Sequence, residues 1–181
     1  GQEDPADENF GGYATGGGFS VYETRPSYQD TVVTQYLDDQ SIPKPPSSYY
    51  NSSNRGFPDV AANGYNLIMR QNSKWVIVGG TSASTPIWGG IFAIMNDHLA
   101  LNGKPSIGFA NPLLYQMFAD GQGTFLNIGD LSTNNDDGCG STLGYTSNPN
   151  GWDPVCGLGT PNVANILAYL DKMMPTLPDA M

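Results

Sequence analysis

One stretch constrains the fold of this chain more than any other: VGGTSASTPIWGG, residues 78–90. Residues 75–78 are a short apolar run typical of a buried strand, and two glycines end it. From Pro86 to about residue 99 the sequence is mostly apolar, which predicts a helix with Pro86 in its first turn. Ser82 is therefore expected at a strand-to-helix turn, where backbone N–H groups can stabilise a developing anion.

Hydroxyl groups in front of a helix usually serve as N-caps, and Thr81, Ser82 and Ser84 fit that role. A nucleophilic serine would need a base instead. The sole histidine, His98, lies sixteen residues after Ser82 and inside the same expected helix. At 1.5 Å per residue the two would be more than about 20 Å apart, so they cannot form a Ser-His pair. Ser82 is thus either not a nucleophile or is activated by a carboxylate, and His98 is expected at the helix end.

The rest of the chain alternates strand-like and helix-like segments. Val32, Val33, Tyr36 and Leu37 have helical spacing, and a polar turn at residues 70–73 separates two strand-like runs. This alternation predicts an α/β fold with a mostly parallel sheet flanked by helices. The other expected elements are an exposed polar arm at 1–15, an extended segment at 16–22, strands at 66–69 and 75–78, and helices at 112–118 and 161–174.

Charge and composition exclude several classes of partner. The 181 residues hold 7 basic and 17 acidic side chains, a net charge of −10, which argues against nucleic acid and anionic membranes. No run approaches the roughly 20 apolar residues that span a bilayer. The first residues lack both a Met and a signal peptide, so we expect a fragment or a chain cut from a longer one. The sequon at Asn51 is typical of a secreted or lysosomal protein.

Residues 120–160 form a long polar stretch with two oxygen-rich segments, GDLSTNNDDGCG and SNPNGWDPVCG. Such loops are candidate Ca²⁺ sites because calcium takes about 6–8 oxygen ligands, backbone carbonyls included. Ordinary turn chemistry is the alternative, since Asp and Asn are common in loops. The two cysteines, Cys139 and Cys156, lack the spacing of a metal site and indicate an oxidising compartment.

Several blocks resemble one known family in composition and order. GGGFSVYETRPSYQ, NRGFPDVAA, GGTSASTPIWGG, GFANPLLY and GWDPVCGLGTPN are similar to blocks of the sedolisin family, the serine-carboxyl peptidases. Together they span residues 16–163. The chain looks most like the tripeptidyl-peptidase and two-chain physarolisin types within that family. The resemblance implies a subtilisin-like fold and a Ser-Glu-Asp triad.

Carried onto this sequence, the resemblance implies that Ser82 is the catalytic nucleophile, with Thr81 and Ser84 as turn and packing residues. The family's Glu and Asp partners and its oxyanion Asp lie upstream of every residue in this chain. Residues 1–181 are then the C-terminal part of a single peptidase domain, inactive alone. A peptide or protein substrate and an N-terminal chain of the same precursor are the implied partners.

The resemblance also implies a calcium site in the 120–160 region. Two departures from the family's pattern, Leu131 for Ile and Pro149 for Gly, both keep the carbonyl oxygen. Asp136 and Asp137 are acidic alternatives nearby. The implied ligands are the side chains of Asp130 and Asp153 and the carbonyls of Leu131, Pro149 and Gly151.

The resemblance favours a disulfide from Cys139 to the partner chain, with a Cys139–Cys156 bridge as the alternative. Cys156 itself stands where the family usually has Thr and inherits no role. Asp59, in the PDVAA block, is a candidate catalytic acid, although a structural Asp that anchors the loop after Pro58 is the favoured interpretation.

Three classes of function compete. An acid peptidase, either a tripeptidyl-peptidase or an endopeptidase, in a secreted or lysosomal compartment, best explains the motif at Ser82. A catalytically inactive sedolisin-like calcium-binding or interaction module would keep the fold and the calcium loop. A carbohydrate-binding or adhesive calcium module fits the tyrosines and acidic loops, but it does not explain GGTSASTP before a helix.

Overall fold

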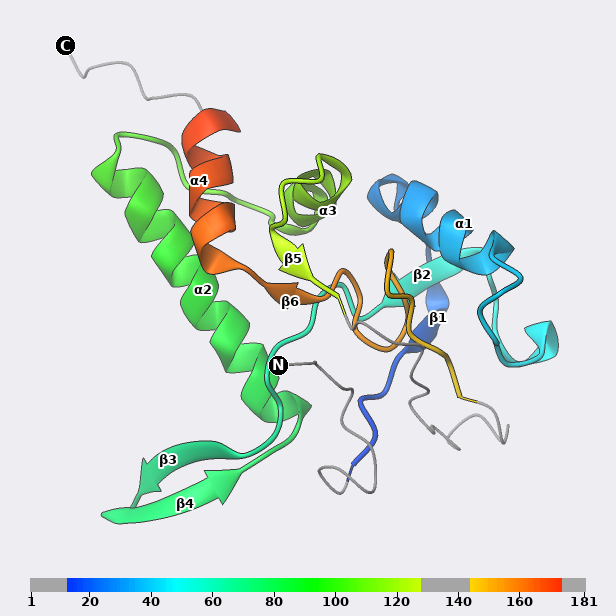
Figure 1. The fold of residues 1–181 in the computed structure, drawn as a ribbon, viewed down its shortest axis with the longest axis horizontal. Coiled ribbons are helices and arrows are strands. Elements are labelled where there is room, and N and C mark those ends of the chain that lie inside the picture. Colours follow the sequence, from blue (N-terminus) through cyan, green and yellow to red (C-terminus); the bar gives the residue numbers. More distant parts are fainter. Residues whose placement is uncertain (1–12, 128–143, 174–181) are drawn as a thin grey trace.

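The structure is a computed structural model that describes residues 13–127 and 144–173. Figure 1 shows the long helix α2 beside α4 on one side, and α1 with the β1–β2 pair on the other. The elements are β1 (Gly18–Thr24), η1 (Ser27–Gln29), α1 (Asp30–Asp38), η2 (Ser47–Tyr49), β2 (Asn54–Phe57), β3 (Leu67–Gln71), β4 (Lys74–Val78), α2 (Thr81–Leu101), α3 (Asn111–Ala119), β5 (Phe125–Leu126), β6 (Thr160–Pro161) and α4 (Val163–Met173).

Every strand pair in the described residues is antiparallel: β1 with β2, β3 with β4, and β5 with β6. The expected parallel pairing therefore does not occur within this part of the chain. The β3–β4 hairpin closes through Asn72 and Ser73, whose φ angles of 48° and 64° are those of a type I′ turn. Such a turn matches the natural twist of two antiparallel strands, so this segment pairs with itself.

The helices follow the predicted hydrophobic spacing. In α1 the buried side chains are Val32, Val33 and Tyr36, as the sequence predicts. Helix α2 packs against α4, and Met95 and Leu99 of α2 are fully buried in the same core as Ile166 of α4. The predicted helices at 112–118 and 161–174 correspond to α3 and α4, within two residues at each end.

Two expectations differ from the structure. The predicted helix at Pro86 begins five residues earlier, at Thr81, so Pro86 lies inside α2. The end of the expected exposed arm is half-buried: the Tyr13 hydroxyl donates to the Gly64 carbonyl at 2.6 Å. The Tyr13 bond joins residues 51 positions apart, and the start of α2 depends on the backbone geometry of Gly80. Local sequence patterns encode neither.

Candidate functional site

The start of α2 is fixed by close backbone packing between two glycine-containing turns. The Gly80 N–H donates to the Gly64 carbonyl at 2.7 Å, and Gly80 has a φ of 122°, which favours glycine. A Cβ on Gly64 would lie 2.3 Å from the Tyr13 hydroxyl. The strand-to-helix turn predicted from the sequence therefore exists, and its glycines let the backbones approach.

The hydroxyl cluster does not cap the helix. The N-cap residue is Gly80, and no side chain caps the first turn of α2. Ser84 Oγ donates to the Asn63 carbonyl at 3.3 Å, and Thr85 Oγ1 donates to the Thr81 carbonyl at 2.9 Å. Ser82 is exposed, and its side chain makes no hydrogen bond with any residue that the structure describes. Ser82 and Thr81 are therefore the hydroxyl residues of this turn whose side chains make no hydrogen bond with the described residues, whereas Ser84 and Thr85 do.

His98 lies where the sequence predicted, in the last turn of α2, and it is not near Ser82. Its Nε2 atom is 2.7 Å from Oδ1 of Asp171 on α4. The two residues are sixteen positions apart in the helix, which corresponds to about 24 Å. The imidazole therefore ties two helices together and cannot act on Ser82.

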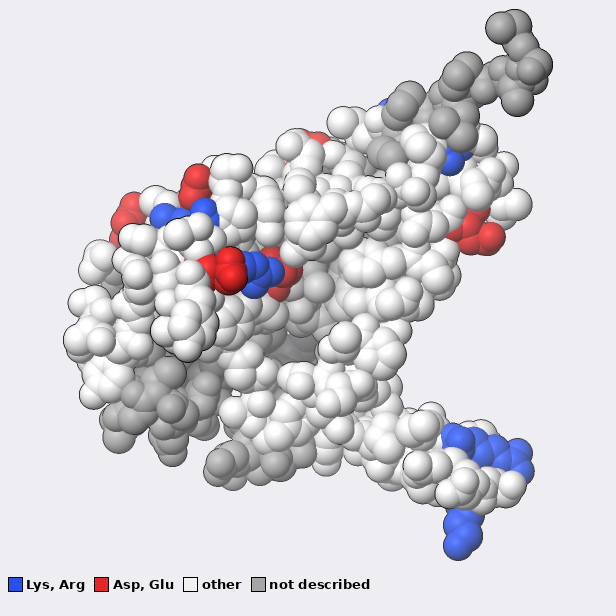
Figure 2. Space-filling model, turned by 180° about the vertical axis from the view of Figure 1, so that it is seen from behind, with Lys and Arg blue, Asp and Glu red and all other residues white. Residues whose placement is uncertain are grey.

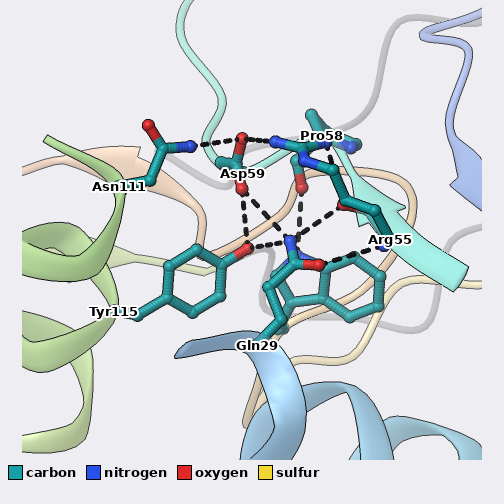
Figure 3. A network of polar contacts seen from close by, with 8 residues as sticks. Gln29, Arg55, Pro58, Asp59, Asn111 and Tyr115 are labelled. Carbon is teal, nitrogen blue, oxygen red and sulfur yellow. Dashed lines mark hydrogen bonds and ion pairs between the residues drawn. The ribbon is translucent and has the colours of Figure 1, made fainter. Parts of the chain in front are cut away.

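Asp59 is a structural anchor, as expected, rather than a free acid. Figure 3 shows side chains from η1, β2 and α3 converging on its carboxylate. Its oxygens accept hydrogen bonds from Tyr115 at 2.9 Å, Asn111 at 3.0 Å and Gln29 at 3.2 Å, and Arg55 forms an ion pair with it. Burial and the neighbouring Asp59 raise the pKa of Tyr115, so its hydroxyl stays a donor. Four donors therefore hold this carboxylate in place, and it joins η1, β2 and α3.

A cavity of about 980 Å³ opens beside the first turns of α2. Its polar rim includes Asn63 and Ser84, and its apolar wall includes Trp88 and Phe92. The Trp88 indole donates to the Ala61 carbonyl at 2.7 Å, which holds α2 against the segment after β2. Ser82 itself does not line this cavity, but its neighbour Thr81 does, so the cavity adjoins the first turn of α2.

The loop at residues 151–159 is completely buried and bonded to the segment that follows β2. The Leu158 N–H donates to the Asp59 carbonyl at 2.8 Å, the Trp152 indole to the Pro58 carbonyl at 3.0 Å, and the Ala61 N–H to the Gly159 carbonyl at 3.0 Å. This loop is therefore part of the core despite its polar, unperiodic sequence.

Asp153 lies inside that loop, 3% exposed. Its carboxylate accepts backbone N–H bonds from Val155 and Cys156 on Oδ1, at 2.8 and 2.7 Å, and from Asn148 on Oδ2, at 2.8 Å. Burial raises the pKa of Asp153 to about 6, and the three N–H donors act in the opposite direction. Among residues 13–127 and 144–173 no Lys or Arg pairs with it.

The expected calcium ligands are only partly within the described structure. Asp130 and Leu131 lie outside the described residues, as do the alternatives Asp136 and Asp137, whereas Pro149, Gly151 and Asp153 share one turn. The described ranges contain no group of three or more His, Cys, Asp or Glu side chains that could hold a metal.

Sequence reasoning missed Asn127, whose side chain donates to the Gly151 carbonyl at 3.3 Å. Its one sequence signal was a polar residue directly after the apolar pair Phe125-Leu126. Of the two cysteines, Cys156 is buried and Cys139 lies outside the described residues, so their pairing stays a prediction.

Comparison with known proteins identifies the family. The chain is 44% identical to physarolisin of Physarum polycephalum over 161 residues, and 46% identical to human tripeptidyl-peptidase 1 over 165 residues. These matches cover 88% and 87% of this chain. The chain belongs to the sedolisin family. No family model matches it.

This sedolisin chain spans 27–28% of the length of those two relatives, and it corresponds to the C-terminal part of the family's domain. A solved structure of Pseudomonas sedolisin, a serine-carboxyl proteinase complexed with two molecules of pseudo-iodotyrostatin, matches with a TM-score of 0.64. That match has 24% identity and covers 87% of this chain and 36% of the other, so it shows the subtilisin-like fold. Across the described residues, no helix is long and apolar enough to cross a membrane.

Proposed function

We propose that this chain carries the nucleophile of an acid serine-carboxyl peptidase and that Ser82 forms the acyl-enzyme. The observation that carries the proposal is the exposed, unbonded hydroxyl of Ser82 in the first turn of a 21-residue helix. Two further observations support the proposal. The relatives of this chain include human tripeptidyl-peptidase 1. The neighbouring Ser84 and Thr85 hydroxyls are already bonded to backbone carbonyls.

In this mechanism Ser82 Oγ attacks the scissile carbonyl carbon while a carboxylate removes its proton. The oxyanion forms beside the first turn of α2, where backbone N–H groups have no helical acceptor. The protonated carboxylic acid then gives its proton to the leaving amine, and water hydrolyses the ester. With the imidazole of His98 about 24 Å away, the base must be an acid of low pKa, so turnover should favour acidic pH.

The base would come from an upstream portion of the same peptidase, and the exposed side of α2 supports this. Ser82, Pro86, Gly89, Ala93 and Ala100 all lie on that side at helical spacing, and all are exposed. A helix that is apolar all round normally lies in a protein interior. The element that covers this side therefore lies against Ser82, and such an element can supply both burial and the base. The peptidase would be active only when that portion is assembled with this chain.

We also propose a structural calcium site at the 151–159 loop. The fit rests on Asp153, a buried carboxylate with no cationic partner among the described residues, two positions after Gly151 in the chain. A divalent ion would supply the missing positive charge. Asp153, Gly151 and Pro149 would hold it with the predicted Asp130 and Leu131. Asn127 is an additional candidate, because its amide oxygen would face the site if the amide were turned over.

Peptides or proteins are the proposed substrates, in a secreted or lysosomal acidic compartment. Asn51 is exposed, and its Oδ1 accepts the Ser53 N–H at 3.0 Å, so its amide nitrogen is open to glycosylation.

The test of the function is peptide hydrolysis by the complete protein across pH 2–9, with substrate peptides whose N-termini are free or blocked. We expect an acidic optimum; loss of cleavage on blocking would indicate a tripeptidyl-peptidase. An optimum above pH 8, or no cleavage at any pH, would contradict the proposal.

A further inference from the structure

The β3–β4 hairpin projects from the body of the molecule, and its side chains do not pack into the core. Figures 1 and 2 show it extending beyond the start of α2, with a hollow between it and the body in Figure 2. Ile68, Trp75 and Ile77 lie on one face and are 71%, 71% and 69% exposed; Met69, on the other face, is 44% exposed. An isolated two-stranded hairpin is only marginally stable in water, so its apolar faces need a cover.

The hairpin also concentrates positive charge on an acidic chain. Figure 2 shows basic atoms at its tip, where Arg70 and Lys74 lie. Neither forms an ion pair within the part of the chain that the structure describes, whereas Arg25 and Arg55 pair with Asp30 and Asp59. Arg70 lies over the ring of Trp75, 5.8 Å from its centroid, and the two are cross-strand partners. The cation and the aromatic ring are thus held together as one recognition surface.

The geometry points to a docking role: we propose that the upstream portion of the peptidase covers the Ile68/Trp75/Ile77 face and pairs its own carboxylates with Arg70, which lies on that face. This rests on the proposed assembly with that portion. The relatives are more than three times longer than the stretch matched here, so such a portion has ample surface. Charge complementarity and apolar burial at one site are typical of specific interfaces.

Docking at the hairpin has a consequence for the nucleophile. Strand β4 ends at Val78, four residues before Ser82, and the Gly80 N–H is fixed to the Gly64 carbonyl. A partner that holds the hairpin therefore also limits where Ser82 can lie. Arg70 is then a positioning residue, which sets Ser82 relative to the incoming base.

Thiol labelling of the complete protein in a Ser82→Ala background tests the docking without reference to activity. Ile77→Cys should react at least about tenfold more slowly than Thr34→Cys, an exposed control site on α1, with both rates read by peptide mass. Equal rates in dilute monomeric protein would overturn the proposal. So would protection that appears only as protein concentration rises, since a second copy would then be the occupant.

Charge reversal tests the positioning role in the otherwise unaltered complete protein. Arg70→Glu should lower kcat at least about fivefold with a smaller change in KM, and it should lower the unfolding midpoint, more so at low salt. Lys172→Glu, an exposed cation at the end of α4, is the matched control and should change neither. Equal effects of the two variants would refute the role of the hairpin. If Ile77→Cys is protected in the Ser82→Ala background but the protein with Ser82 intact cleaves no peptide, the peptidase proposal is refuted and the docking stands.

Discussion

His98 Nε2 lies 2.7 Å from Asp171 Oδ1, so the one histidine of this chain joins the C-terminal ends of α2 and α4. Ser82 lies at the other end of the same helix. The imidazole of His98 is therefore too far from Ser82 to act on it, and the first prediction follows from this separation.

His98→Gln should leave peptide turnover and its pH optimum unchanged in the complete protein. The substitution removes a partly exposed ion pair, which contributes below about 1 kcal/mol to the free energy of unfolding. Steady-state kinetics across acidic pH measures the effect. A loss of more than tenfold in kcat with an intact fold would mean that the imidazole does take part.

Ser82→Ala should abolish turnover, by about 10⁴-fold or more in kcat, because the acyl-enzyme of the proposed mechanism forms on its hydroxyl. Its effect on the unfolding midpoint should be small, since the side chain is exposed and unbonded. Ser84→Ala is the matched control: it loses only the 3.3 Å bond to the Asn63 carbonyl and should keep substantial activity. The reverse order of effects would move the nucleophile to Ser84.

Gly157→Ala and Gly121→Ala form a matched pair for the buried loop. Both glycines have φ near 62°, so both variants carry the same backbone strain of about 1–2 kcal/mol. A Cβ on Gly157 would lie 2.4 Å from the Asp59 carbonyl, whereas one on Gly121 meets nothing within 4 Å. Gly157→Ala should therefore destabilise by more than about 3 kcal/mol, measured by denaturant unfolding. Equal destabilisation would show that the loop packs differently.

The stability of the calcium-free protein should depend on the protonation of Asp153. Burial raises its pKa to about 6 from 3.8, so between these values the folded state holds a proton that the unfolded chain releases. In chelator, the free energy of unfolding should therefore fall as pH rises from about 4 to 6, by roughly 2–3 kcal/mol. Asp153→Asn has no such proton and should flatten that slope.

Calcium should reverse this trend, because the ionised carboxylate of Asp153 would then have a cation to bind. The unfolding midpoints with calcium and with chelator should diverge as pH rises through 6. Differential scanning calorimetry in the two buffers gives the comparison. Identical midpoints at every pH would leave the loop as ordinary turn structure.

The sequence predicted the features that depend on local patterns. Helix α1 follows from the spacing of its apolar residues, and the two strands β3 and β4 follow from two strand-like runs around the polar turn at residues 70–73. Strand β2 was not predicted, because Asn54 to Phe57 is short and its partner β1 lies more than 30 residues upstream. The start of α2 was misplaced because its position depends on the bond from Gly80 to Gly64.

The same distinction applies to the candidate site: features set by the local sequence were predicted, and features set by tertiary contacts were not. The motif around Ser82 was visible because its residue types and spacing are unusual, and Asp59 because it follows a proline in a turn. Asn127 was missed, since its role depends on the neighbouring Gly151 carbonyl, 24 residues away. The base for Ser82 could not be located at all, because the proposed mechanism places it in another portion of the peptidase.

Pro86 inside α2 has a mechanical consequence. Residue 86 of an uninterrupted helix would donate its N–H to the carbonyl of Ser82, and proline has none to give. The first turn is thus joined to the rest of the helix by one backbone bond fewer. A small rotation of Ser82 therefore breaks fewer backbone bonds, so the turn that bears the nucleophile can adjust to an incoming base while the rest of α2 stays rigid.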